Sequence, residues 1–118
     1  LKPSDIGYIN AHGTATVRGD AAETKAIQRV FGDLPVPVSS TKGATGHMMA
    51  AGGITELIAC IKAMETGFLP PTIPYEEKDE ACDLSIVTDV AAAEVKITMS
   101  NAFGFGGQNS SVILGKYK

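Results

Sequence analysis

The segment Ser39-Ser40-Thr41-Lys42-Gly43-Ala44-Thr45-Gly46-His47 decides the fold that the sequence predicts, because a short β-branched run leads into it and a long apolar segment leads out of it. Glycines at positions 43 and 46 allow the backbone to turn sharply and to approach a ligand closely. We expect His47 to lie near the first turn of the following helix, where free N–H groups and the helix dipole favour a neutral imidazole and any anion beside it. Taken alone, the segment also fits a loop before a helix with an incidental histidine.

The apolar segment after this loop predicts a helix over residues 47–66. Its first turns contain the pair Gly52-Gly53, and each glycine costs about 1 kcal/mol against alanine in a helix interior. Close contact with another backbone is the expected compensation. The residues expected to face the core are Ile54, Leu57, Ile58, Ile61 and Met64.

A similar strand and helix precede the loop. Residues 5–11 predict a strand that ends at His12-Gly13-Thr14-Ala15-Thr16, and residues 20–31 predict a helix with Asp20 as N-cap and Glu23 completing a capping box. Because a buried carboxylate requires a cation, we predict a buried ion pair between Glu23 and Lys42. Two series of residues four apart are expected to face the core: Ala22, Ala26 and Val30, and Glu23, Ile27 and Phe31.

The C-terminal third predicts strands rather than helices. Residues 95–100 and 110–114 alternate apolar and polar side chains, which indicates two antiparallel strands joined by the glycine-rich residues 101–109. Residues 84–87 indicate a short strand and residues 91–93 a loose turn. We therefore expect an α/β fold, βαβα followed by antiparallel strands, with a mixed sheet and helices on its faces. Ligands collect at the carboxyl ends of strands in such sheets, so His12, Lys42, His47 and the glycine-rich loop should meet at one edge.

Composition narrows the possible partners. The 118 residues fit one domain and carry a net charge of −3, and no Lys/Arg cluster alternates with aromatic residues, so nucleic-acid and anionic-membrane binding have no electrostatic basis. Cys60 and Cys82 are too few and too far apart for a disulfide framework or a zinc site, so we expect no metal and a reduced, cytoplasmic setting. The chain opens at Leu1 without a methionine and enters its first predicted strand within a few residues, so we interpret it as a fragment of a longer chain. The sequence shows no signal peptide.

Three motifs together resemble the C-terminal half of elongating β-ketoacyl-acyl-carrier-protein synthases, the condensing enzymes of fatty acid and polyketide assembly. The motifs are His12-Gly13-Thr14-x-Thr16, Ser39-Ser40-Thr41-Lys42-x-x-x-Gly46-His47 and Asn101-x-Phe103-Gly104-Phe105-Gly106-Gly107-x-Asn109. The resemblance covers nearly the whole chain. It implies a thiolase-like fold in which two similar halves pack into five layers, with residues 1–118 forming the C-terminal synthase domain and the N-terminal half absent. It also implies a homodimer when the protein is complete.

The resemblance implies a Cys-His-His site and two steps: acyl transfer from the carrier protein to a cysteine, then decarboxylation of malonyl-carrier protein and attack of the carbanion on the acyl thioester. His12 and His47 match the histidines that donate hydrogen bonds to the malonyl thioester oxygen. We expect their ring nitrogens to approach a common point, with each Nδ1 accepting from the backbone or a neighbour. No cofactor is implied beyond the phosphopantetheine of the acyl carrier protein.

Other positions match supporting residues of the family. Lys42 matches the active-site lysine, Glu23 its carboxylate partner with Asp20 beside it, and Phe105 the gating phenylalanine whose N–H helps form an oxyanion hole. The residues implied to bind the pantetheine arm or to belong to the same mobile loop are Thr14, Thr16, Phe103, Gly104 and Gly106.

The nucleophilic cysteine of the family has no counterpart in this chain. Cys60 falls inside a helix and Cys82 in a surface loop, so the chain alone should not condense acyl groups. Two alternatives remain open from the sequence. One is a decarboxylase-only or chain-length-factor homologue, and the other is a non-catalytic domain that serves as a scaffold or dimerisation element.

Overall fold

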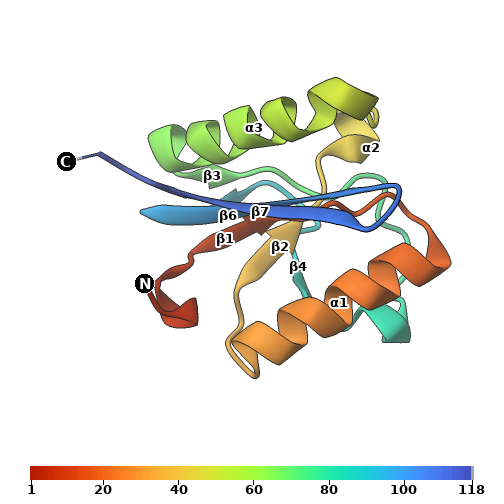
Figure 1. Cartoon of the computed structure of the whole chain (residues 1–118). Helices are drawn as coiled ribbons and strands as arrows, with labels where there is room; N and C mark the ends of the chain where they lie inside the picture. Colours follow the sequence, from red (N-terminus) through yellow and green to blue (C-terminus); the bar gives the residue numbers. More distant parts are fainter. Residues whose placement is uncertain (118) are drawn as a thin grey trace.

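The computed structural model describes residues 1–117, in which a five-stranded mixed sheet lies between two helices (Figure 1). The strand order is β4-β2-β1-β6-β7; the first four strands run parallel to their neighbours, and β7 is antiparallel to β6. The strands are β1 Tyr8–Asn10, β2 Pro37–Ser39, β4 Ser85–Ile86, β6 Ile97–Gly104 and β7 Gln108–Gly115, and the long helices are α1 Val17–Phe31 and α3 Gly52–Thr66. This arrangement confirms the predicted α/β class and the antiparallel pair at the C-terminal end.

Several shorter elements connect these parts. A second, two-stranded antiparallel sheet replaces the loose turn that was expected at residues 91–93, since that segment pairs with the residues after α3. The short elements are β3 Phe68–Leu69, β5 Ala91–Ala92, α2 Lys42–Thr45 and the 3-10 turns η1 Pro3–Asp5, η2 Met49–Ala51 and η3 Glu80–Cys82.

None of the helices in residues 1–117 combines the length and the apolar character that crossing a bilayer requires.

The two helices cover opposite faces of the sheet, with α3 above it and α1 below it in Figure 1. Adjacent residues of a strand point to opposite faces, and β1 shows this directly. Ile9 packs in the hydrophobic cluster that contains Ile27 of α1, whereas Tyr8 packs in the cluster that contains Ala63 of α3. The central strand is therefore buried on both sides.

Helix α1 begins earlier than expected. Its N-cap is Thr16 and its first residue is Val17, so the predicted N-cap and capping box at Asp20 and Glu23 are wrong. Asp20 instead lies in the first turn, where a carboxylate is favoured by the helix dipole. Of the two predicted core-facing series, only the one that contains Glu23, with Ile27 and Phe31, is buried; the series with Ala22, Ala26 and Val30 is exposed.

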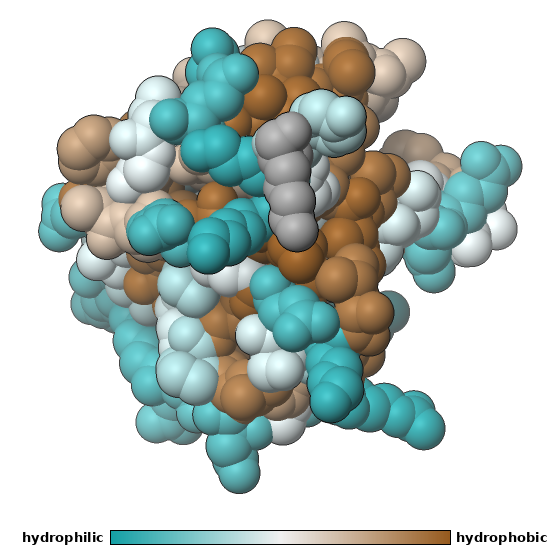
Figure 2. Space-filling view, turned by 90° about the vertical axis from the view of Figure 1, so that its left-hand side faces the viewer, coloured by the Kyte–Doolittle hydropathy of each residue, from teal (hydrophilic) through white to brown (hydrophobic). Residues whose placement is uncertain are grey.

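Helix α3 also differs from the prediction. It begins at Gly52 rather than at residue 47, because Met48 and Met49 adopt positive φ angles and η2 precedes the helix. Ile54 and Ile58 are 59% and 51% exposed, and Ile61 is exposed as well, so the predicted core face is wrong at these positions; Met64 is buried and Leu57 is half-buried. Figure 2 shows apolar surface in the upper part of the molecule, which is the layer that α3 forms in Figure 1. The residues of α3 that are buried are Gly52, Glu56, Cys60, Ala63 and Met64.

The glycine pair at the start of α3 has the close backbone contact that was expected, but only at one of its two positions. A Cβ atom on Gly52 would lie 2.6 Å from the carbonyl oxygen of His47, whereas a Cβ atom on Gly53 would meet nothing within 4 Å. Gly52 therefore lets the segment that carries His47 approach α3. Gly53 has no such role.

These neighbouring glycines give a matched pair of substitutions. We expect Gly53→Ala to raise the free energy of unfolding by about 0.5–1 kcal/mol, because alanine suits a helix better than glycine. Gly52→Ala should lower it by about 1–3 kcal/mol, because the backbone of His47 must move. Chemical denaturation of both variants measures the difference. Equal effects of the two substitutions would contradict the close approach at Gly52.

Candidate active site

The side chains that follow β1 and β2 meet at the carboxyl edge of the sheet, as predicted. The imidazole rings of His12 and His47 have centroids 5.5 Å apart and lie nearly at right angles, with an interplanar angle of 84°. His12 lies two residues after the end of β1, and His47 lies two residues after the end of the short helix α2. His47 does not lie in the first turn of α3, which corrects the predicted helix N-terminus at this residue.

Each imidazole accepts a backbone hydrogen bond at Nδ1. The N–H of Phe103 donates to Nδ1 of His12 at 3.3 Å, and the N–H of Met49 donates to Nδ1 of His47 at 3.2 Å. A neutral imidazole has one donor and one acceptor nitrogen, so both bonds require the proton to lie on Nε2. The two rings thus present N–H groups on the side away from the backbone.

The surroundings of His12 favour its neutral form. Burial lowers the pKa of His12, and the positive charge of Lys42 lowers it further, while Glu23 and Glu56 oppose the shift. The ring also lies 5.3 Å from that of Phe103. His12 is therefore suited to donate a hydrogen bond from a neutral ring rather than to carry a positive charge.

Glu23 does not pair with Lys42, and the predicted ion pair is wrong. Its Oε1 accepts hydrogen bonds from the N–H of His12 and from Nδ2 of Asn101, each at 3.0 Å, and its Oε2 accepts from the N–H of Gly13 at 3.0 Å. Glu23 is 5% exposed. The buried carboxylate is therefore compensated by three N–H donors instead of by a cation.

Lys42 forms its ion pair with Glu56 of α3, and both side chains are almost completely buried. Glu56 is the functional residue that the sequence analysis missed. One signal was present: Gly52, Glu56 and Cys60 are four residues apart, which places the carboxylate on the same helix face as small residues. Removal of one partner from such a buried pair costs about 3–5 kcal/mol.

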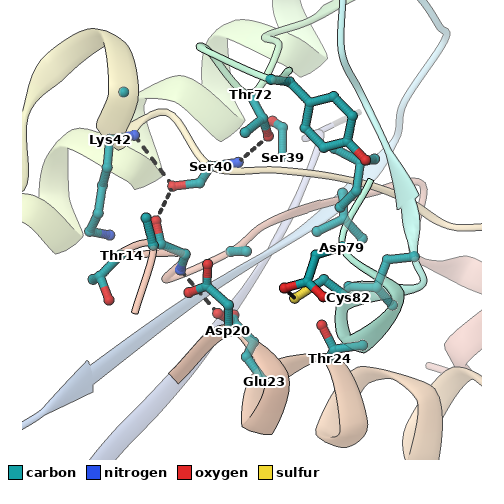
Figure 3. Close-up of a pocket in the computed structure, with 18 of the residues that line it drawn as sticks. Thr14, Asp20, Glu23, Thr24, Ser39, Ser40, Lys42, Thr72, Asp79 and Cys82 are labelled. Carbon is teal, nitrogen blue, oxygen red and sulfur yellow. Dashed lines mark hydrogen bonds between the residues drawn. The ribbon is translucent and has the colours of Figure 1, made fainter. Parts of the chain in front are cut away.

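Ser40 connects the two loops that carry the histidines. Its Oγ donates to the carbonyl of Gly13 at 2.8 Å and accepts from the N–H of Lys42 at 3.4 Å, and its own N–H donates to Oγ1 of Thr72 at 3.0 Å (Figure 3). Gly13 has a φ of +39°, and a Cβ atom there would lie 2.6 Å from the Cβ of Ser40. A residue with a side chain at position 13 would separate the loops.

A cavity of about 520 Å³ opens beside this cluster. Lys42 and His47 are among the residues that line it, as are Asp20 and Glu23 of α1 and several residues of the segment 73–82. Figure 3 shows Lys42 and Asp79 on different sides of this cavity. Burial raises the pKa of Asp20, and the nearby charge of Glu23 adds to the shift. Of the predicted substrate-binding residues, Thr14 lines the cavity, with its Oγ1 3.5 Å from that of Thr16.

The glycine-rich loop is the tip of the hairpin formed by β6 and β7. Phe103 lies within β6 and contacts His12, as described above, whereas Phe105 is 97% exposed at the turn. Gly104 ends β6, and Gly106 in the turn has a φ of +83°. The structure therefore brings Phe103 to the histidines and leaves Phe105 away from them.

Neither cysteine has the surroundings of a nucleophile. Cys60 is completely buried in α3, and burial raises the pKa of its thiol to about 11. The Sγ of Cys82 lies 3.8 Å from Oδ2 of Asp79, and burial raises its pKa as well. Because the thiolate is the reactive form, a raised pKa makes each of these thiols a poorer nucleophile.

Comparison with known proteins identifies the family. The sequence model of the protein family described as the β-ketoacyl synthase C-terminal domain matches residues 1–76. The chain belongs to this family. It is 46% identical over 112 residues to nodulation protein E of Rhizobium leguminosarum bv. trifolii and 46% identical over 114 residues to 3-oxoacyl-[acyl-carrier-protein] synthase 1 of Escherichia coli K12, covering 93% and 96% of this chain. The chain spans 28% of the length of each of these relatives.

Solved structures confirm the ketosynthase fold. The synthase domain superposes on the ishigamide ketosynthase/chain length factor with a TM-score of 0.97 and 39% identity, covering 100% of this chain and 30% of that one. A β-ketoacyl synthase from Burkholderia phymatum STM815 gives a TM-score of 0.92 and 39% identity, with 100% and 29% covered. The family and the thiolase-like fold that the three motifs indicated are thereby confirmed.

The role of Glu23 can be tested by a substitution that keeps its shape. In Glu23→Gln, the amide NH₂ must face an N–H donor in either orientation, so we expect the free energy of unfolding to fall by about 2–4 kcal/mol. Glu65→Gln, at the exposed ion pair with Lys62, is the control and should change stability little. Chemical denaturation measures both. A loss for Glu23→Gln no larger than that for Glu65→Gln would show that the three hydrogen bonds do not hold the site.

The state of His12 can be tested by NMR of ¹⁵N-labelled histidine. We expect the proton on Nε2 and a titration midpoint below the ordinary value of 6.5. Since the folded pKa lies below the unfolded one, the neutral ring contributes stability that is complete above about pH 6.5 and is lost as the pH falls through the lower folded value. A midpoint above 6.5, or a proton on Nδ1, would contradict the site geometry.

Proposed function

We propose that this chain is the C-terminal part of a β-ketoacyl-acyl-carrier-protein synthase, which condenses malonyl-carrier protein with an acyl-enzyme thioester in fatty acid or polyketide synthesis. The observation that supports this most is the pair of imidazoles, 5.5 Å apart, whose Nδ1 atoms both accept backbone hydrogen bonds. Two neutral N–H donors in one place suit a single oxygen on which negative charge develops.

The proposed step is decarboxylation of the malonyl thioester. The bond between the α-carbon and the carboxylate carbon breaks, carbon dioxide leaves, and the electron pair moves onto the α-carbon and the thioester oxygen. His12 and His47 donate hydrogen bonds to that oxygen as its charge grows. Loss of one such donor costs about 2.7–4 kcal/mol in other enzymes. Lys42, which pairs with Glu56, adds to the effect of burial in lowering the pKa of His12.

The carbanion then attacks the acyl thioester. A bond forms between the α-carbon and the acyl carbonyl carbon, and the thioester C–S bond breaks to release a cysteine thiolate, which takes up a proton. Since Cys60 and Cys82 have raised pKa values, this nucleophile is expected in an N-terminal half beyond the present sequence. The chain alone should therefore catalyse no condensation.

The remaining predicted residues are assigned supporting roles in this reaction. Thr14 and Thr16 bind the pantetheine arm, and Phe105 gates the acyl site and contributes its N–H to the oxyanion hole. Phe103, Gly104 and Gly106 belong to the same loop, and Asp20 supports Glu23. The substrates arrive on the phosphopantetheine of an acyl carrier protein, so no resident cofactor is required. The complete synthase is proposed to be a homodimer.

The two histidines give the direct test, in the complete synthase that contains this chain. We expect His12→Ala and His47→Ala each to slow release of carbon dioxide from malonyl-carrier protein by about 10²–10³-fold. Transfer of a labelled acyl group to the cysteine should continue, because that step does not use these donors. Acyl-enzyme labelling and carbon dioxide release measure the two steps separately. Release at the wild-type rate in both variants would refute the proposed roles.

A further inference from the structure

Thr72 lies where the regular hydrogen bonding between strands β2 and β4 stops. Up to that point the two strands form a parallel ladder: Val38 pairs with Ile86, and the N–H of Val87 donates to the carbonyl of Val38 at 2.9 Å. If the ladder continued, its next bond would run from the N–H of Ser40 to the carbonyl of Val87. In this structure, Thr72 interrupts the ladder at that bond.

Thr72 bonds to both groups that the continued ladder would have joined. Its N–H donates to the carbonyl of Val87 at 2.8 Å, and its Oγ1 accepts from the N–H of Ser40 at 3.0 Å (Figure 3). Prolines occupy positions 70, 71 and 74, and each of them fixes its φ angle. The hydroxyl of Thr72 is therefore presented to Ser40 by a segment with little backbone freedom.

Ser40 passes this connection on to the loop that carries His12. Its Oγ donates to the carbonyl of Gly13 at 2.8 Å, and the N–H of Gly13 donates to Oε2 of Glu23 at 3.0 Å. Since His12 directly precedes Gly13, the hydroxyl of Thr72 lies two hydrogen bonds from the backbone beside that histidine.

The residue after Thr72 contacts the other loop of the site. A Cβ atom on Gly43 would overlap the carbonyl group of Ile73, whereas one on Gly46 would meet nothing within 4 Å. Gly46 has a φ of +79° and so serves the turn, while glycine is needed at position 43 for space. Because Lys42 directly precedes Gly43, the backbone of Ile73 lies against the start of α2.

We propose that Thr72 is a positioning residue for decarboxylation of the malonyl thioester, and that residues 72 and 73 fix the loops of His12 and Lys42 relative to each other. This inference rests on the proposed function, because two donors from different loops must be aimed at one oxygen. Thr72 acts through Ser40 and does not itself bond to the substrate. Without its hydroxyl, the N–H of Ser40 needs another acceptor, and turning toward one moves its Oγ away from Gly13. A misplacement of about 1 Å can slow a reaction about 10²-fold.

The test uses the complete synthase with Thr72→Val, which keeps the shape but lacks the hydroxyl, and with Thr72→Ser, which retains the hydroxyl. Thr66→Val is the matched control, because Oγ1 of Thr66 also accepts a backbone N–H, that of Phe68 at 3.3 Å, but at the C-terminal end of α3. In Thr72→Val we expect kcat for carbon dioxide release from malonyl-carrier protein to fall at least about tenfold, with KM nearly unchanged. In Thr72→Ser and Thr66→Val, kcat should stay near the wild-type value.

Transfer of a labelled acyl group to the cysteine separates positioning from folding. It should continue at the wild-type rate in all three variants, because that step does not use the histidine donors. If Thr72→Val loses this transfer through misfolding, Thr72→Ala replaces it, with the same results expected.

Three results would overturn the positioning role alone: an unchanged kcat in Thr72→Val, an equal fall in Thr72→Ser, or an equal loss of acyl transfer and carbon dioxide release in both the valine and the alanine variants. The last of these would reveal a role in folding only. Carbon dioxide release at the wild-type rate in both His12→Ala and His47→Ala would instead count against the proposed function.

Discussion

The carboxylate of Glu23 is the interaction on which the rest of the site depends. Three N–H groups, from His12, Gly13 and Asn101, converge on its two oxygens, and Asn101 is in turn held by Oγ of Ser111 at 2.7 Å. One buried charge therefore joins the end of β1, helix α1 and both strands of the β6–β7 hairpin. Hydrogen bonds to an ionised acceptor are shorter and stronger than neutral ones, so this junction fixes His12 against Phe103.

A second buried carboxylate, that of Glu56, is compensated by a cation and not by N–H donors. Lys42 and Glu56 neutralise each other, which ties the loop after β2 to α3, while Gly52 lets the backbone of His47 pack against the start of that helix. Each histidine is thus held by an element anchored through a buried carboxylate. Burial of His12 and the charge of Lys42 both lower the pKa of that imidazole, and so the arrangement favours the neutral form of His12.

Sequence reasoning predicted what depends on local pattern and strand order: the α/β class, the hairpin, and the meeting of His12, Lys42 and His47 at one edge. It failed where partners are decided by three-dimensional distance. The requirement that a buried carboxylate be compensated was correct for Glu23, but backbone donors meet it as well as a cation does, and Glu56 was the acid within reach of Lys42. The apolar residues Ile54 and Ile58 indicated a core face, whereas the sheet contacts the side of α3 with small residues. Hydrophobicity alone does not show which apolar side of a helix meets the sheet.

The central claim is that Glu23 holds the His12 loop as firmly as the core strands. Native-state hydrogen exchange of the His12 and Gly13 amides tests it most directly, because both residues are only half-buried and lie outside any strand. If the carboxylate bonds are as strong as proposed, these amides should exchange as slowly as the amide of Ala11, which is bonded to Ser39 between β1 and β2. Exchange at the rates of exposed loop amides, while Ala11 stays protected, would contradict the account.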